Sequence, residues 1–215
     1  MEEIKLILLG ESGVGKTSIM MRFAKNKYDD LKGSTICIEY ATKILEYKGK
    51  SYNIQLLDTV GQEKYRSIIN SYYHLGNGFF IVFDLTDEHS LNSVHYWIED
   101  IKEKCKDPDP IIIILGNKSD LINIKISDDI INKELECCKN KIYIETSAKD
   151  NINITTAFEQ MIDLIEKDNN LKSDNKSFDL SKGKSKNYGK NKNNQCCWEL
   201  ISLIFLLDQH LLHQN

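Results

Sequence analysis

The sequence predicts an α/β fold: a doubly wound, mostly parallel six-stranded sheet with one antiparallel edge strand. Two observations carry this prediction. Short apolar runs alternate with segments of helical periodicity from Ile4 to about Lys167, which is typical of strands connected by crossover helices. The runs at 79–85 and 111–115 are continuously apolar, as expected for strands that helices cover on both faces. Such sheets bind ligands at the carboxyl ends of their strands, so candidate site residues should follow the strands.

Local patterns predict each element in turn. Residues 4–9 form a buried apolar strand, and the periodicity of residues 17–25 indicates a helix. The alternating segments 36–47 and 51–57 flank the turn pair Lys48-Gly49 and therefore predict an antiparallel hairpin. After the strand at 79–85, the remaining predictions are helices at 90–104, 127–139 and 152–167 and strands at 111–115 and 141–144.

Composition and charge argue against several classes of protein. A net charge of −4 and a pI near 5.8 speak against a dedicated nucleic-acid-binding protein. The acidic start predicts no secretory signal peptide, and the longest near-continuous apolar run, 200–207, is too short to span a membrane. The six cysteines have no metal-ligand spacing, which favours reduced thiols. We therefore expect a soluble, cytoplasmic chain.

The strongest chemical signal is a glycine-rich loop, GESGVGKT at 10–17, which matches GxxxxGK[ST] between a strand and a helix. Such a loop binds phosphate because glycine lets successive backbone N–H groups point inward. Lys16 is expected to reach the β- and γ-phosphates, and the Thr17 hydroxyl to hold Mg²⁺. The strand–loop–helix context disfavours the alternative, a glycine-rich turn without a ligand.

A second candidate segment, DTVGQE at 58–63, ends the third predicted strand. The Asp58 carboxylate is placed to hold Mg²⁺ through water, and the N–H of Gly61 to contact a γ-phosphate. Because DxxG is common by chance, the argument depends on its position beside the phosphate loop. An ordinary turn at the end of a strand is the alternative.

Two further segments suggest a binding site for a purine base. NKSD at 117–120 follows the strand 111–115, and a carboxylate there that accepts from N1–H and the exocyclic amine selects guanine over adenine. With 26 Lys against 2 Arg, the chain has a bias that favours chance motifs of this kind, but the position at the ligand-binding edge supports a base site. TSAK at 146–149 is placed to offer a backbone N–H to the guanine carbonyl, although alone it would equally suit a helix N-cap.

Taken together, these motifs make residues 4–167 resemble the small GTPases of the Ras superfamily, and within it the Rab family of membrane-traffic regulators. Five motifs occur in order: GESGVGKT, Thr35 of STICIEY, DTVGQE, GNKSD and ETSAK. The stretches TICIEY, QEKYRSIINSYYHLGNG and FDLTDEHSLNSVHYWIEDI are similar to Rab proteins, most of all to the branch acting between endoplasmic reticulum, Golgi and plasma membrane. The resemblance implies the P-loop small-GTPase fold.

The resemblance also implies roles for the matching positions. Gln62 and Lys16 would be catalytic, with Gln62 orienting the attacking water, and Thr17, Thr35 and Asp58 would hold Mg²⁺, Asp58 through a water. GTP or GDP would contact Ser12, Gly13, Val14, Gly15, Lys16, Thr17, Ser18, Tyr28, Thr35, Gly61, Asn117, Lys118, Asp120, Ser147, Ala148 and Lys149.

Partners follow from the same resemblance. Residues 28–40 and 59–75 would be two switches that the γ-phosphate orders and that bind effectors. The implied regulators are a guanine-nucleotide exchange factor, a GTPase-activating protein and a GDP-dissociation inhibitor or escort protein. No nucleic acid is expected among the partners.

Two positions depart from the family pattern. Val60 stands where the family has Ala, and its extra methyl groups predict slower GTP hydrolysis or a shifted switch, with a neutral change as the alternative. Leu57 replaces the Trp of an effector-facing aromatic triad, represented here by Tyr40, Leu57 and Tyr72, so effector choice does not carry over.

The composition changes after residue 168, which predicts a GTPase domain at 1–168 and a flexible tail at 169–197. The tail ends in Cys196-Cys197, a pair that resembles a Rab prenylation site and would direct the chain to the cytosolic face of endomembranes. In the family such a pair lies at or near the end, whereas 18 residues, 198–215, follow it here. That apolar extension is either a product of read-through or gene-model error or a genuine docking segment, and the cysteines accept lipid only after its removal.

These observations favour a Rab-type switch that binds and hydrolyses GTP and regulates vesicle traffic. One alternative is a nucleotide-holding binding module whose hydrolysis Val60 impairs. Another is a P-loop kinase or ATPase, which NKSD and TSAK disfavour because they lie where a guanine base would bind.

Overall fold

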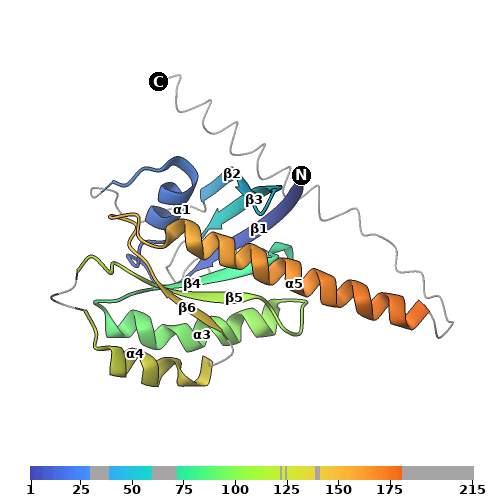
Figure 1. Cartoon of the computed structure of the whole chain (residues 1–215). Coiled ribbons are helices and arrows are strands. Elements are labelled where there is room, and N and C mark those ends of the chain that lie inside the picture. Colours follow the sequence, from blue (N-terminus) through green and yellow to red (C-terminus); the bar gives the residue numbers. More distant parts are fainter. Residues whose placement is uncertain (30–38, 60–71, 122, 124, 139–140, 181–215) are drawn as a thin grey trace, which may run out of the picture. The chain divides into compact units, whose positions relative to one another are not determined.

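The structure, a computed structural model, describes residues 1–29, 39–59, 72–121, 123, 125–138 and 141–180 (Figure 1). The chain divides into two units, Met1–Ile165 and Glu166–Asn215. The sheet and the candidate site belong to the first unit. Of the second, the structure describes only the continuation of a helix to residue 180. Within the described part of the chain, no helix combines the length and the apolar character that crossing a bilayer requires.

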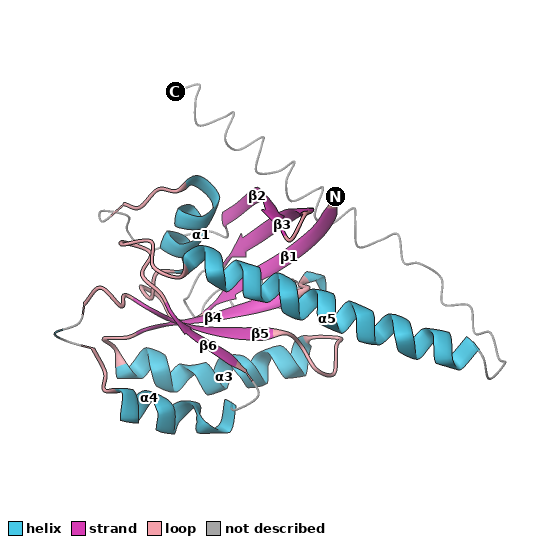
Figure 2. Cartoon of the chain, in the orientation of Figure 1, coloured by secondary structure: helices cyan, strands magenta, loops and turns pink. Residues whose placement is uncertain are grey.

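A six-stranded sheet in the order β2-β3-β1-β4-β5-β6 forms the centre of the first unit (Figure 2). All neighbouring strands are parallel except β2 and β3, which pair as an antiparallel hairpin at one edge. The strands are β1 (Glu2–Leu9), β2 (Glu39–Tyr47), β3 (Lys50–Asp58), β4 (Gly78–Asp84), β5 (Ile112–Asn117) and β6 (Ile142–Glu145). The predicted fold class is confirmed, including its antiparallel edge strand.

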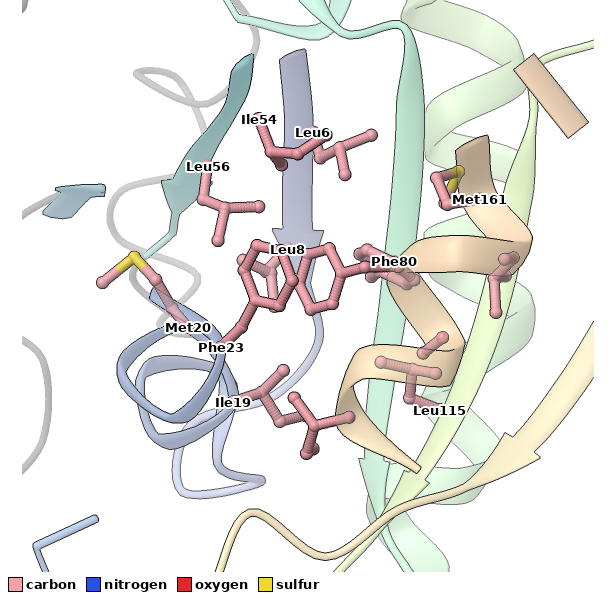
Figure 3. Close-up of a cluster of buried hydrophobic side chains, with 14 of the residues drawn as sticks. Leu6, Leu8, Ile19, Met20, Phe23, Ile54, Leu56, Phe80, Leu115 and Met161 are labelled. Atoms are coloured by element: carbon pink, nitrogen blue, oxygen red, sulfur yellow. The ribbon is translucent and has the colours of Figure 1, made fainter. Parts of the chain in front are cut away.

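Helices cover both faces of this sheet, which explains why its central strands are apolar throughout. They are α1 (Lys16–Lys25), α3 (Glu88–Lys104), α4 (Asp128–Glu134) and α5 (Ile154–Leu180), with short 3₁₀ turns η2 (Tyr73–Leu75) and η4 (Leu135–Cys138). Side chains of α1 and of the first part of α5 pack on one face with Leu8 and Phe80 (Figure 3). The Phe23 ring, near the end of α1, stacks on Phe158 of α5 at 3.6 Å between centroids and holds this part of α1 against α5.

Several element boundaries differ from the prediction, each for a local reason. The helix predicted to start at residue 152 starts at Ile154, because Asn151 and Asn153 have φ angles of 59° and 56°, outside the helical region. It also continues past 167 to Leu180, through a polar stretch that contains neither glycine nor proline. The segment predicted as one helix at 127–139 is α4 followed by η4, a tightening that is common in last turns.

The aromatic triad expected at the effector surface is only partly exposed. Leu57 lies opposite Tyr40 in the antiparallel ladder and is fully buried. Tyr40 and Tyr72 are half-buried. The substitution of Trp by Leu therefore falls at a packed position of β3.

Candidate functional site

The candidate residues meet at one edge of the sheet, in the loops that follow β1, β3, β5 and β6 (Figure 1). All four strands are parallel, so their carboxyl ends point the same way. Because β1 pairs with β3 on one side and with β4 on the other, the loop after β1 lies between the loops after β3 and β4. Segments distant in the sequence thereby form one continuous site, as expected for a doubly wound sheet.

The loop between β1 and α1 is closed toward the sheet and open on its other side. Gly10, with φ 135°, lies so close to β4 that a Cβ there would come within 2.1 Å of the Val82 carbonyl oxygen. Gly13, with φ 81°, has no described atom within 4 Å of the position of a Cβ. Both backbone conformations favour glycine. The loop thus presents an accessible backbone concavity of the kind that binds anions.

Lys16 places its amine inside this loop rather than in solvent. Its Nζ donates to the carbonyl oxygens of Gly10 at 2.8 Å and Glu11 at 2.6 Å. Burial lowers the pKa of Lys16 to about 8, against the opposing effect of the nearby Asp58 and Glu11 carboxylates. A buried cation of this kind favours a ligand that brings compensating negative charge.

Thr17 and Asp58 form a buried pair next to the amine. The Thr17 hydroxyl, in the first turn of α1, donates to the Asp58 carboxylate at the end of β3. These are hard oxygen donors, which fit Mg²⁺. No cluster of three or more His, Cys, Asp or Glu side chains suited to a metal occurs among the residues that the structure describes. A site with only one or two protein ligands is also suited to Mg²⁺, because this ion keeps several of its waters and takes further oxygens from substrate phosphates.

Asn117 connects the glycine-rich loop to the loop after β6. Its Nδ2 donates to the Val14 carbonyl at 2.9 Å, and its Oδ1 accepts from the Ala148 N–H at 3.2 Å and the Thr146 hydroxyl at 3.4 Å. The Asn117 side chain is 2% exposed, so all of these bonds are sheltered from water. The Asn117 side chain therefore fixes the position of the glycine-rich loop relative to the loop after β6.

Asp120 is oriented by the loop after β6. The Ser147 hydroxyl donates to its carboxylate at 2.6 Å and accepts from the Asp150 N–H at 2.9 Å. A carboxylate fixed in this way is suited to accept from two adjacent donors of a guanine ring.

Lys118, between these two residues, adopts a left-handed backbone with φ 68°. Its ammonium lies 2.5 Å from the Asp84 carboxylate at the end of β4. Asp84 in turn accepts from the N–H and hydroxyl of Thr86. The strained backbone of Lys118 is therefore held in place by an ion pair, as is common at binding sites.

Beside the loop, the start of the first switch borders a cavity of about 810 Å³. Tyr28 and Ser18, both expected to contact nucleotide, lie on its wall. The described lining residues are Ser18, Met21, Arg22, Asn26, Lys27, Tyr28 and Asp29. Ser12, at the tip of the glycine-rich loop, is exposed.

The remaining predicted residues fall outside the described residues. They are Thr35, Val60, Gly61 and Gln62 in the two switches and Cys196 and Cys197 in the tail. The structure therefore brings together the predicted phosphate loop, the Thr17–Asp58 pair and the base-binding segments.

Sequence reasoning missed one residue of this site, Arg22. Its guanidinium donates to the carbonyl oxygens of Ala148 and Lys149, both at 2.8 Å. Every residue type has a backbone carbonyl, so a contact with these groups does not require particular residues in the partner loop. No sequence motif could therefore have indicated the contact made by Arg22.

Comparison with known proteins agrees with the geometry. The family model described as "Ras family" matches residues 5–167. The chain is 38% identical over 158 residues to "Ras-related protein RGP2" of Oryza sativa subsp. japonica, covering 74% of this chain and 72% of that protein. It is 35% identical over 196 residues to "GTP-binding protein ypt1" of Schizosaccharomyces pombe, covering 90% of this chain and 96% of the relative.

Proposed function

The chain belongs to the Ras family of small GTPases, with the features of its Rab branch, and from this premise we propose that it is a GTP-hydrolysing switch that regulates vesicle traffic. The observation that carries the proposal is the connection made by Asn117. It joins a cationic phosphate loop containing Lys16 to the segment that holds Asp120. A ligand that satisfies both ends at once has a phosphate chain and a guanine base.

Hydrolysis of GTP breaks the bond between the γ-phosphorus and the β–γ bridging oxygen as water attacks, giving GDP and phosphate. The Lys16 ammonium is placed to stabilise negative charge on the β- and γ-phosphates. Thr17 and Thr35, with Asp58 through a water, would hold Mg²⁺, whose contribution is to neutralise phosphate charge. Gln62 is proposed to orient the attacking water.

We expect turnover to be slow without an activating protein. Only two arginines occur in the chain, Arg22 and Arg66. The Arg22 guanidinium is engaged by the loop after β6. Neither arginine lies in one of the nucleotide motifs, so we expect an activating protein to supply positive charge to the γ-phosphate in trans.

The proposed partners follow the Rab pattern. An exchange factor, an activating protein, a GDP-dissociation inhibitor or escort protein, and effectors would bind through residues 28–40 and 59–75. The chain would cycle between the cytoplasm and the cytosolic face of endomembranes of the secretory route, held there by lipid on Cys196 and Cys197 once the extension 198–215 is removed. Localising the full chain beside one that ends at Cys197 tests this part: only the shorter chain is expected on membranes.

Nucleotide competition and single-turnover hydrolysis test the central proposal. The full chain should bind GTP and GDP in preference to ATP and ADP, and hydrolyse bound GTP. Gln62→Ala should retain GTP binding but lose most hydrolysis, whereas Asp120→Ala should lose the preference for guanine. Equal affinity for ATP and GTP in the unmodified chain would contradict the proposal.

A further inference from the structure

We propose that Arg22 is a positioning residue for the base-binding loop and sets how long, and how selectively, guanine nucleotide is held. The inference rests on the proposed function and assigns a role outside its motifs. Arg22 lies on α1, whereas Ala148 and Lys149 precede α5. The contact therefore joins the helix that follows the phosphate loop to the loop that follows β6.

The contact is a two-pronged hydrogen bond to successive carbonyl groups. Nε of Arg22 donates to the Ala148 oxygen and Nη2 to the Lys149 oxygen, each at 2.8 Å. The planar guanidinium matches this spacing because its donors are fixed in a fork, which a lysine ammonium cannot reproduce. Charge-assisted bonds of this kind are stronger than neutral ones.

The two carbonyls determine how the loop presents its N–H groups. In a trans peptide the carbonyl and the following N–H point in opposite directions. With the Ala148 carbonyl directed at Arg22, the Lys149 N–H must face away from α1. The N–H of Ala148 is itself held by Asn117. Arg22 and Asn117 together thus fix the backbone that is expected to meet the guanine carbonyl.

Arg22 also contacts the start of the first switch. Its Nη1 lies 3.3 Å from both the carbonyl and the side-chain oxygen of Asn26, the residue that ends α1. Its guanidinium carbon lies 5.9 Å from the centre of the Tyr28 ring. One side chain therefore links the base-binding loop to the residue expected to stack on the base, so loosening either element affects the other.

A matched control contacts the same helix from strand β2. Lys43 of β2 donates to the Phe23 carbonyl of α1 at 2.7 Å and lies 4.4 Å from the Phe23 ring. Like Arg22 it is a cation that donates to a backbone carbonyl, but its hydrogen bond and its ring contact are both with Phe23 and do not reach the loop after β6. Lys43→Met therefore reports the effect of losing a basic anchor of α1 alone.

The first experiment measures release of a fluorescent GDP analogue from the full chain, as unmodified protein and as Arg22→Met, Arg22→Lys and Lys43→Met. Arg22→Met should release the analogue about tenfold faster or more, as the loss of a charge-assisted pair predicts. Arg22→Lys, with a single ammonium, should be intermediate, and Lys43→Met should stay within about twofold of the unmodified protein. Equal release by Arg22→Met and the unmodified protein would overturn the inference.

The second experiment separates positioning of the loop from general loosening. In 6-thioguanosine diphosphate, sulfur replaces the carbonyl oxygen while N1–H and the exocyclic amine remain; in inosine diphosphate only the amine is lost. Arg22→Met should lose most of the preference for GDP over the thio analogue and keep the preference over inosine diphosphate, which Asp120 provides. An equal loss of both preferences would overturn the positioning role. If the unmodified protein does not prefer GDP to ADP, the proposed function fails instead.

Discussion

The side-chain amide of Asn117 donates to the carbonyl oxygen of Val14 over 2.9 Å. This bond joins the end of β5 to the glycine-rich loop after β1, although β4 lies between the two strands. The close approach depends on Gly15, where a Cβ would come within 2.3 Å of the Asn117 Nδ2. A residue of the base-binding motif therefore shapes the phosphate loop.

Asn117→Ala should weaken both the fold and nucleotide binding. It removes the partner of the Val14 carbonyl and the Ala148 N–H, and leaving such buried groups unsatisfied costs about 1–3 kcal/mol. Denaturation in urea, with and without saturating GDP, measures the loss. Asn132→Ala, on the exposed side of α4, is the control and should stay near the unmodified protein. Equal midpoints for both variants would contradict the structural role of Asn117.

Gly10→Ala and Gly13→Ala should separate folding from binding. The added methyl group at Gly10 meets the β4 backbone at Val82, which cannot move without disturbing the sheet, so we expect severe destabilisation. At Gly13 it meets no described atom, and the left-handed backbone costs only about 1–2 kcal/mol. Thermal melting should therefore show a folded Gly13→Ala protein, and titration should show that its nucleotide affinity is reduced. A Gly10→Ala protein as stable as Gly13→Ala would refute this assignment.

The sequence predicted those parts of the fold and of the candidate site that depend on residue type, and missed those that depend on contacts with the backbone. Lys16, Asp58 and Asp120 lie at one edge of the sheet, a position that the sequence predicts because apolar runs and crossover helices determine strand order and direction. The curvature of the phosphate loop depends on its own glycines, so the shape of this loop could be predicted from its residue types. Arg22 was not predicted as part of the site, because its partners are backbone carbonyls, which every residue type offers equally.

The ends of helices were harder to predict than their presence, because an end depends on the backbone conformation of a single residue. The delayed start of α5 follows from the left-handed backbone of Asn153, whose Nδ2 also donates to the Glu145 carbonyl at 2.8 Å. Helical periodicity continues through such a residue without a visible change. Asparagine tolerates this conformation better than most residues, but nothing in the pattern said which asparagine would adopt it.

Tyr73→Phe should lower stability through the loss of one hydroxyl. Tyr73, in η2 within the second switch region 59–75, is buried and donates to Asp100 of α3. Asp100 also accepts from Tyr96 and Lys104, so its charge remains partly compensated. We expect a loss of about 1–2 kcal/mol in urea denaturation. Tyr96→Phe, whose hydroxyl lies 3.3 Å from Asp100 on a more exposed side chain, should lose less; the reverse order would contradict the prediction.

The pKa of Lys16 predicts opposite effects of pH on binding and on folding. Burial lowers this pKa to about 8 in the nucleotide-free protein, from an ordinary value of 10.5. Above pH 8 the free protein increasingly loses the proton that a phosphate ligand requires, so GDP affinity should fall by up to about tenfold per pH unit. Between pH 8 and 10.5 the unfolded chain binds more protons at Lys16 than the folded one, so this residue makes the free energy of unfolding rise with pH.

Lys16→Met separates these effects from the titration of other groups. Between pH 7 and 9, titration of the unmodified protein with GDP should show the fall in affinity together with proton uptake on binding. Urea denaturation of the nucleotide-free protein over the same range should show an upward contribution to stability that Lys16→Met lacks. Identical pH slopes of stability in the two proteins would mean that Lys16 keeps its proton in the loop. The ammonium would then already be charged before phosphate arrives, and its burial between the Gly10 and Glu11 carbonyls would be compensated by those oxygens and by Asp58.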